Sequence, residues 1–325
     1  MPSIWSPQAR KVLRQLQQKR VLLAFDFDGT LVPHFPAPNP VVVAPETLRL
    51  LRLINEHIPL AIVTGRSVAD ISQFLDPKEF LIVGNYGCET PWMTMSQQKK
   101  MHAKAALVRK SFEDFLEHHG LLHRVFVEDK AHSLSLHSKD MKLLRRIDTL
   151  ARHATSTELR PHRRQFGIGT LNIFPEGAPN KGDAVLEIMK RKQCTHAIFS
   201  GDDLPDEDVF ELMKQVTGVR VGYRKNTHAK FHVKSQEEMD EFLALMVSVF
   251  CFIDTEKEMP PFVFAQGDIS FITASLPTPV PTATAAASTK ATTAAGTAVS
   301  ATVATSAATE RRTRTAIVGR HPRTL

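Results

Sequence analysis

The 325-residue sequence is poor in cysteine and contains no apolar run long enough to cross a membrane. Its cysteines, Cys88, Cys194 and Cys251, are scattered and form no CxxC pair, which argues against a disulfide framework and against a zinc site. The longest strongly apolar stretch, residues 242–253, is shorter than the about 20 residues of a spanning helix, so we expect a helix packed on a core. The first 20 residues are polar and basic, without the apolar middle region of a signal peptide. These shortages predict a cytoplasmic protein with no membrane span.

The sequence also lacks a basic binding face, although its net charge is +7 and its pI is about 9.4. Most of the excess positive charge lies in residues 277–325, a stretch rich in Ala, Thr and Pro with few large apolar side chains. Such a composition buries too little apolar surface to offset the entropy lost on ordering, so we expect a disordered tail over residues 256–325. The rest of the chain is nearly neutral, so we expect no nucleic-acid partner. The arginines of the tail could still bind a nucleic acid.

Short apolar runs alternate with helical patterns in two parts of the chain. Residues 21–25 are apolar throughout, as in a strand buried on both faces, and residues 44–57 place leucines at helical spacing. Because this alternation resumes after residue 180, we predict an α/β fold whose core is a doubly wound, Rossmann-like parallel sheet. We assign residues 1–95 and 175–255 to this core. Its further expected helices are 68–75, 181–192, 206–216 and one from about Ser235, and its further expected strands start at 59, 80, 196 and 218.

Residues 96–174 follow a different pattern, which predicts a smaller α/β cap domain inserted into the larger sheet. Runs of alternating polarity are typical of half-buried antiparallel strands. The expected cap helices are 103–119 and 139–153, and the expected cap strands lie within 123–130, 132–139, 155–161 and 169–175.

Two acidic clusters each follow an apolar run. The segment VLLAFDFDGTLVP (21–33) places Asp26 and Asp28 after the first strand, and HAIFSGDDLPDEDVF (196–210) repeats the pattern. Alternating strand positions point to the same side, and α/β folds bind ligands at the carboxyl ends of their strands. One carboxylate of such a pair can bind a metal and attack, while the other serves as acid and then base. The alternative is a pair of loop acids that cap the next element.

With these residues the chain resembles the haloacid dehalogenase superfamily of phosphotransferases. DFDGT, VTGRS with Thr64, NKGDA with Lys181, and GDDLPD (201–206) match its four motifs in order. Within that superfamily, GNYGCE (84–89), VEDKAHSLSLH (127–137), PNKGDAVL (179–186) and GDDLPDEDVF are similar to trehalose-phosphate phosphatases. The similarity covers about residues 15–250 and leaves the tail outside.

The resemblance implies a role for each motif residue. Asp26 would be the nucleophile that forms an aspartyl-phosphate, and Asp28 would act as acid and then base. Thr64 and Lys181 would stabilise the negative charge of the transition state. Mg²⁺, which prefers hard oxygen ligands, would be held by Asp26, Asp202 and the Asp28 backbone carbonyl. Asp203 and Asp206 would support Lys181 and metal-bound water, and the phosphate end of the substrate would contact Asp26, Phe27, Asp28, Gly65 and Arg66.

The resemblance also implies that Glu128, Lys130, His137 and Asn172 of the cap contact a sugar. The alternative is that Glu128, Lys130 and the nearby histidines form a solvated strand face. Four other histidines lack the spacing of metal ligands, and we expect them at the surface: His118, His119, His123 and His132.

Four positions depart from the pattern of the trehalose-phosphate phosphatases. Asn172 stands where Glu is usual, Lys139 where Arg is frequent, Tyr86 where His is often found, and Pro205 where Thr is often found. We expect none of them to contact the reacting groups, but all of them weaken the assignment of trehalose 6-phosphate as substrate.

Three functions remain open. The first is a Mg²⁺-dependent trehalose-phosphate phosphatase, whose pathway partner would be a trehalose-phosphate synthase. The second is a sugar phosphatase for mannosyl- or glucosyl-3-phosphoglycerate, whose anionic glycerate would favour the basic cap residues Arg160, Arg163 and Arg164. The third is a non-catalytic regulatory relative, although such proteins typically lose the nucleophile or the acid, and both Asp26 and Asp28 are present.

Overall fold

The computed structural model describes residues 1–34, 42–154, 159 and 162–251. These residues belong to one compact unit, Met1–Ser275. The predicted tail over 256–325 lies outside the described residues, as does most of the strand expected at 155–161. Among the described residues, no helix is both long and apolar enough to span a membrane.

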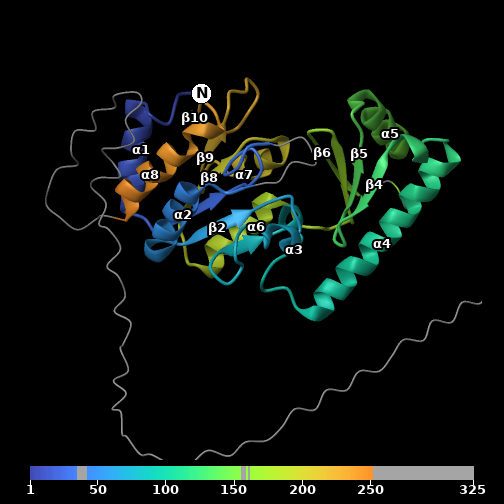
Figure 1. Cartoon of the computed structure of the whole chain (residues 1–325), viewed down its shortest axis with the longest axis horizontal. Coiled ribbons are helices and arrows are strands. Elements are labelled where there is room, and N and C mark those ends of the chain that lie inside the picture. The colour runs from blue at the N-terminus through green and yellow to red at the C-terminus, as the bar shows by residue number, and fades with distance from the viewer. Residues whose placement is uncertain (35–41, 155–158, 160–161, 252–325) are drawn as a thin grey trace, which may run out of the picture. The chain divides into compact units, whose positions relative to one another are not determined.

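The larger sheet has six parallel strands in the order β10-β9-β8-β1-β2-β3 (Figure 1). The chain starts in the middle of this sheet, adds strands on one side and then returns to the other side, so the predicted doubly wound α/β core is confirmed. The strands are β1 (Val21–Phe25), β2 (Leu60–Val63), β3 (Leu81–Val83), β8 (His196–Gly201), β9 (Val216–Val221) and β10 (Phe231–Val233).

Helices cover both faces of this sheet. Phe25 of β1 packs edge-on against Phe242 of α8, while its neighbour Ala24 belongs to the core cluster of α6 and α7, so adjacent residues of β1 face opposite helical layers. This two-sided burial explains why β1 is apolar throughout. One layer holds α1 (Pro7–Gln17), α2 (Pro45–His57) and α8 (Met239–Phe250), and the other holds α6 (Lys181–Arg191) and α7 (Glu207–Phe210).

Several expected elements differ in length. The helix expected at 206–216 is only α7, since Val216 begins β9 and pairs with Ala197 of β8. Pairing with a buried central strand therefore outweighs the local helical pattern. The helix expected at 68–75 is a single turn, α3 (Val68–Ile71). No strand was expected at β10.

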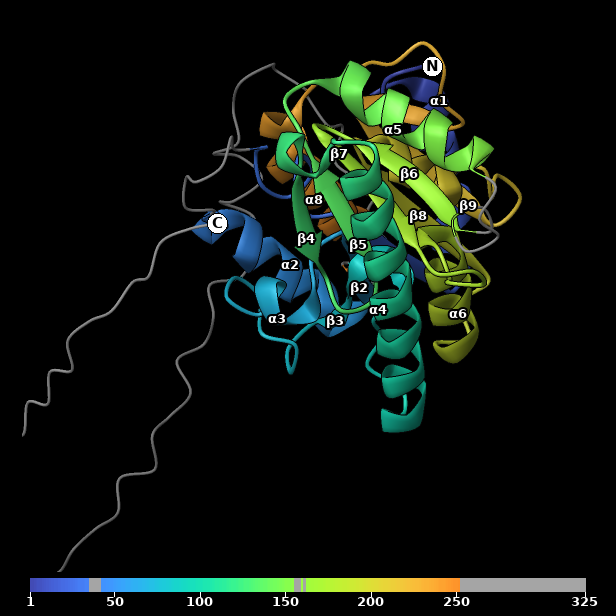
Figure 2. The ribbon, with the colours of Figure 1, turned by 90° about the vertical axis from the view of Figure 1, so that its right-hand side faces the viewer.

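The cap has a four-stranded antiparallel sheet in the order β4-β5-β7-β6. Its long helix begins well before the expected start at residue 103, because Thr94 and Gln97 form a capping box. Figure 2 shows α4 and α5 lying in front of this sheet. The elements are α4 (Met95–His118), β4 (Phe126–Asp129), β5 (Leu134–His137), α5 (Met141–His153), β6 (Arg163–Gly167) and β7 (Thr170–Phe174).

The two faces of the cap sheet differ in polarity. Leu134, Leu136, Leu171 and Ile173 pack with α4 and α5 in one apolar cluster. The residues between them face the other way, and strand register aligns four of them in a polar row across the sheet: Glu128, Ser135, Asn172 and Gln165. Antiparallel pairing places such side chains within reach of one another.

Candidate active site

Asp26 is the residue directly after β1, at the carboxyl end of the central strand. Its backbone N–H donates to the Ser200 carbonyl of β8 at 2.8 Å, which fixes the residue between two strands. The residue is 6% exposed. Burial raises the pKa of the Asp26 carboxyl well above its ordinary value, and the nearby Lys181 ammonium opposes this shift.

Lys181 is the first residue of α6, and its side chain is almost fully buried. Its Nζ lies 2.8 Å from Oδ1 of Asp26 and 2.7 Å from Oδ1 of Asp206. Burial alone would lower the pKa of Lys181, but these two carboxylates raise it, so the lysine stays charged. Asn180 caps the helix and forms a capping box with Asp183, which holds the lysine at a helix N-terminus that attracts anions.

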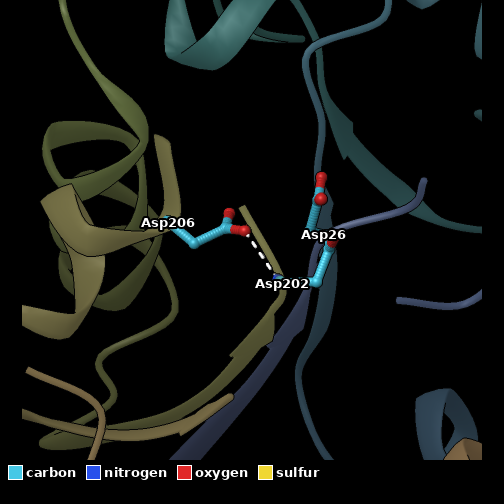
Figure 3. Close-up of side chains that lie close together, drawn as sticks. All are labelled: Asp26, Asp202 and Asp206. Atoms are coloured by element: carbon cyan, nitrogen blue, oxygen red, sulfur yellow. Dashed lines mark hydrogen bonds between the residues drawn. The ribbon is translucent and has the colours of Figure 1, made fainter. Parts of the chain in front are cut away.

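Asp206 ties the second acidic cluster to Lys181. Its Oδ2 accepts hydrogen bonds from the backbone N–H groups of Asp202 and Asp203, both at 2.9 Å, while Oδ1 receives Lys181. Figure 3 shows that Asp206 and Asp202 come from the segment after β8 and face Asp26 at the end of β1. Burial raises the pKa of Asp206, and Lys181 opposes the shift.

Asp26, Asp202 and Asp206 can each offer an oxygen, and these oxygens lie within 4.8 Å of one another. Three carboxylates in a mostly buried cluster carry more negative charge than the single Lys181 ammonium neutralises. Hard oxygen donors and uncompensated negative charge are the features that a divalent cation such as Mg²⁺ needs. The residues therefore fit a metal site. Asp206 already uses both of its oxygens on Lys181 and on two backbone N–H groups, whereas Asp26 pairs with Lys181 through one oxygen.

Asp28 lies beside the loop of the second motif, residues 63–67. Both of its oxygens accept from Arg66, at 2.7 Å each, and Arg66 also pairs with Asp70 at 2.9 Å. Thr64 is fully buried at the end of β2, and its Oγ1 accepts from the Arg66 backbone N–H at 3.1 Å. Arg66, predicted to contact substrate, thus orients the predicted acid and base.

The turn after Asp28 requires glycine. Gly29 has φ +78°, and an added Cβ would overlap the side chains of Asp202 and His34. His34 Nε2 lies 2.8 Å from Asp202 Oδ2, and this hydrogen bond raises the pKa of His34 to about 9. Thr30 also donates to Asp202, at 3.3 Å. Neither residue was expected in the site, although Thr30 is the last residue of the DFDGT motif and His34 follows that motif closely.

Phe27 lies between the two motif aspartates, but its side chain is fully buried. The ring packs against Phe74 and under the Arg66 guanidinium, with centroid distances of 5.8 and 5.5 Å. Only the backbone of Phe27 can therefore serve the predicted substrate contact.

Three of the predicted sugar-contacting residues form one hydrogen-bonded group on the cap. His137 Nε2 lies 2.7 Å from Glu128 Oε2, and Lys130 Nζ lies 3.7 Å from the same oxygen. Lys130 Nζ also donates to the backbone carbonyl of Gly65 at 3.4 Å, so this group contacts the loop of the second motif. Glu128 and His137 are partly exposed, whereas the fourth residue, Asn172, is fully buried.

Tyr86 lies beside Lys181, one of the predicted reacting groups, contrary to the expectation for this position. Lys181 Nζ is 5.8 Å from the centre of its ring, and Asn172 Nδ2 donates to its hydroxyl at 3.2 Å. An added Cβ on Gly65 would overlap the same ring. Two features point to Tyr86. It departs from the family pattern, and position 65, beside its ring, needs glycine.

One of the four histidines expected at the surface is buried. His132 is 3% exposed and lies between the cap and the loop after β3, with Nδ1 3.4 Å from Nδ2 of Asn85 and its ring 4.5 Å from the His102 ring. Burial lowers its pKa. The expectation was wrong because the alternating pattern of β5 begins only at Leu134. The other three, His118, His119 and His123, are exposed as expected.

Comparisons with known proteins agree with this geometry. A maize protein, trehalose 6-phosphate phosphatase RA3, is 25% identical over 266 residues, covering 73% of this chain and 72% of the maize protein. The C-terminal domain of the Candida albicans trehalose-6-phosphate phosphatase aligns with TM-score 0.60 at 20% identity, covering 75% of this chain and 97% of that domain. The C-terminal domain of the C. albicans trehalose synthase regulatory protein also shares the fold, with TM-score 0.56, 12% identity, and coverage of 75% and 99%.

The decisive comparison is with protein families. The profile of the trehalose-phosphatase family matches residues 24–245, a range that includes the whole acidic cluster and the cap. The chain therefore belongs to the trehalose-phosphatase family.

Proposed function

We propose that the protein is a Mg²⁺-dependent phosphatase that hydrolyses trehalose 6-phosphate to trehalose and phosphate. The observation that carries this proposal is the buried group of Asp26, Lys181 and Asp206, with Asp202 beside it. The group combines a nucleophile, a fixed positive charge and carboxylate ligands at the carboxyl end of the central strands. The cytoplasmic location and the synthase partner predicted from the sequence belong to the same proposal.

In the first half of the reaction, an Asp26 oxygen attacks phosphorus and the bond to the sugar oxygen breaks. Asp28 gives its proton to that oxygen, so the sugar leaves as a neutral alcohol and Asp26 carries the phosphoryl group. Asp28 must turn one oxygen from Arg66 towards the leaving group, while Arg66 keeps hold of the other oxygen. In the second half, water attacks phosphorus, Asp28 accepts its proton and Asp26 is released with phosphate.

Charge stabilisation comes from groups that are already in place. Lys181 is held by its ion pairs with Asp26 and Asp206, and Thr64 is held by β2 and Arg66. Preorganised donors of this kind need no rearrangement as charge develops. A Mg²⁺ ion held by Asp26, Asp202 and the Asp28 carbonyl would neutralise phosphate oxygens.

The second candidate substrate, a glycosyl-3-phosphoglycerate, needs free basic residues in the cap. Arg164 is paired with Asp148 and its side chain is 1% exposed, and Arg163 stacks 3.8 Å from the Phe174 ring centre and donates to the Pro179 carbonyl. Arg160 lies outside the described residues. These contacts favour a neutral sugar over an anionic one.

The test is a phosphate-release assay with Mg²⁺ on trehalose 6-phosphate, both glycosyl-3-phosphoglycerates and p-nitrophenyl phosphate. We expect the highest kcat/KM on trehalose 6-phosphate, and at least a ~10³-fold loss for Asp26→Asn, whose fold should persist. Mg²⁺ should also raise the Tm of the wild type, since a ligand that binds only the folded state stabilises it, and Asp202→Asn should lose most of that rise. Preference for another ester would refute the substrate, and near-normal turnover by Asp26→Asn would refute the mechanism.

A further inference from the structure

Tyr86 joins the loop of the second motif to the cap. Its hydroxyl accepts from Nδ2 of Asn172 on β7, and its ring packs edge-on against Phe174 with centroids 5.5 Å apart. Lys130 of the cap lies 5.7 Å from the ring centre and Lys181 of the core lies 5.8 Å from it. One partly buried side chain thus contacts both the cap sheet and the charged centre.

The backbone of Tyr86 is fixed in an uncommon conformation. It has φ 55° and ψ 33°, and the preceding residue, Asn85, also has positive φ, 48°. Such angles are unfavourable for bulky residues and persist only where neighbouring contacts enforce them. Here the Tyr86 N–H donates to the Thr64 carbonyl at 2.9 Å and the Asn85 N–H donates to the Arg66 carbonyl at 2.7 Å. Tyr86 is therefore anchored to the loop that holds Thr64 and Arg66.

Asn172 uses its amide on protein groups. Its Oδ1 accepts from the Ser135 hydroxyl at 2.6 Å, and its Nδ2 donates to Tyr86 and, at 3.5 Å, to the Thr170 hydroxyl. The residue has no exposed surface. Both donors and one of the two lone pairs of the amide are therefore used, and the buried side chain is not accessible to a sugar hydroxyl.

We propose that Tyr86 and Asn172 form a latch that couples the closed position of the cap to the loop of the second motif, so that Asn172 acts on catalysis through Tyr86 and not by contacting the sugar. This inference rests on the proposed phosphatase activity. The Tyr86 hydroxyl bond is made across the boundary between core and cap and is lost when they separate. This hydrogen bond therefore contributes to kcat/KM only for substrates whose turnover requires the cap to be closed over the core.

Such a latch has two consequences for its variants. The loss of activity should be larger on the sugar phosphate than on a small ester, and variants of Tyr86 and of Asn172 should share it. A neutral hydrogen bond of this kind changes an equilibrium by about threefold to tenfold. Tyr86→Phe keeps the ring contacts and removes only the hydroxyl, and Asn172→Ala removes the other partner. Because both variants break the same bond, and Asn172→Ala also removes the acceptor of the Ser135 hydroxyl, the double variant should be little worse than Asn172→Ala alone.

The experiment compares Tyr86→Phe, Asn172→Ala and their double variant on trehalose 6-phosphate and on p-nitrophenyl phosphate, which lacks a sugar for the cap to enclose. Tyr223→Phe, in the chain's other tyrosine, is 73% exposed in the wild type and serves as the matched control. We expect about a threefold to tenfold fall in kcat/KM on the sugar phosphate for each variant, a smaller fall on the aryl phosphate, and no change for the control. Additive losses, or equal losses on both esters, would refute the latch.

A second measurement tests the latch without relying on the substrate assignment. Hydrogen exchange of residues 84–89 and of β7 in the substrate-free protein should become faster to a similar extent in Tyr86→Phe, Asn172→Ala and the double variant. Tyr223→Phe should leave it unchanged. If the wild type cleaves no sugar phosphate, the proposed function fails, but shared faster exchange still supports the latch. Unchanged exchange in both single variants would overturn it.

Discussion

At the residue scale, the site depends on a lysine that sequence patterns treat as a surface residue. Lys181 is 2% exposed, and its position between Asp26 and Asp206 leaves no water to solvate either charge fully. A buried charge is tolerated only when it is paired, so removing the lysine would leave the two buried carboxylates without their shared cation. The arrangement proposed to stabilise a phosphoryl group should therefore also help to keep this part of the core folded.

A second buried titratable residue gives a prediction about pH. His196 of β8 is 8% exposed, its Nε2 lies 3.1 Å from Thr217 Oγ1, and burial lowers its pKa from 6.5 to about 4. Between these values the imidazole at position 196 binds a proton in the unfolded chain and not in the folded chain. The contribution of His196 to stability is therefore present above about pH 6.5 and is lost as the pH drops from about 6.5 to about 4. The wild type should be less stable at pH 4.5 than at pH 7. We expect this difference in the free energy of unfolding to be about 1–2 kcal/mol smaller in His196→Gln, after allowance for solvent screening.

Urea unfolding of wild type and variant at both pH values measures this difference, with the exposed His153→Gln as control. If His196→Gln loses stability on acidification as steeply as the wild type, His196 is not the group that titrates.

At the scale of elements, the start of α6 is constrained by the segment that follows the fourth motif. Gly182 is the second residue of this helix, and an added Cβ would run into the backbone carbonyl of Asp208 in α7. Alanine favours a helix over glycine by about 1 kcal/mol, but a clash with backbone cannot be relieved by a side-chain rotation. The clash should therefore outweigh the helix propensity of alanine, so that the net effect of Gly182→Ala is destabilising.

We expect Gly182→Ala to destabilise the protein by more than about 1 kcal/mol. It should also lower kcat by at least about tenfold, because moving α6 away from α7 displaces the neighbouring Lys181. Lys190→Ala, at an exposed position on the same helix, is the matched control and should change neither quantity. Thermal unfolding and phosphate release measure both, and a stabilised, fully active Gly182→Ala would show that α6 and α7 do not pack as described.

The elements also show why some features could be predicted from the sequence and others could not. Asp26 and Asp28 were found because a strand places the residues after it at a known edge of the sheet, which is a local rule. Tyr86 was not, because its ring is held by Asn172 and Phe174, which lie far along the chain in another domain. The end of α7 was misjudged for a similar reason, since pairing between β8 and β9 sets it. Contacts between distant segments are what a single sequence leaves open.

At the scale of the whole molecule, the proposed catalytic groups occupy a limited part of the chain. The family match ends at residue 245 and α8 ends at Phe250, while the last residue of the proposed site is Asp206. The apolar end of α8 is buried, with Phe242 packed against Phe25 of the central strand. The core thus requires the chain to about residue 250, and the low-complexity stretch beyond it contributes no residue to the site proposed here.

We therefore expect removal of residues 261–325 to leave kcat/KM within about twofold and the Tm nearly unchanged, since the remaining chain keeps every helix and strand described. Phosphate release and thermal unfolding of the full and shortened proteins provide the measurement. The removed stretch carries most of the excess positive charge as arginines. If these arginines bind anions, the shortened protein should bind single-stranded nucleic acid more weakly than the full protein at low and moderate salt. An inactive or unfolded shortened protein would mean that the folded unit extends past residue 260.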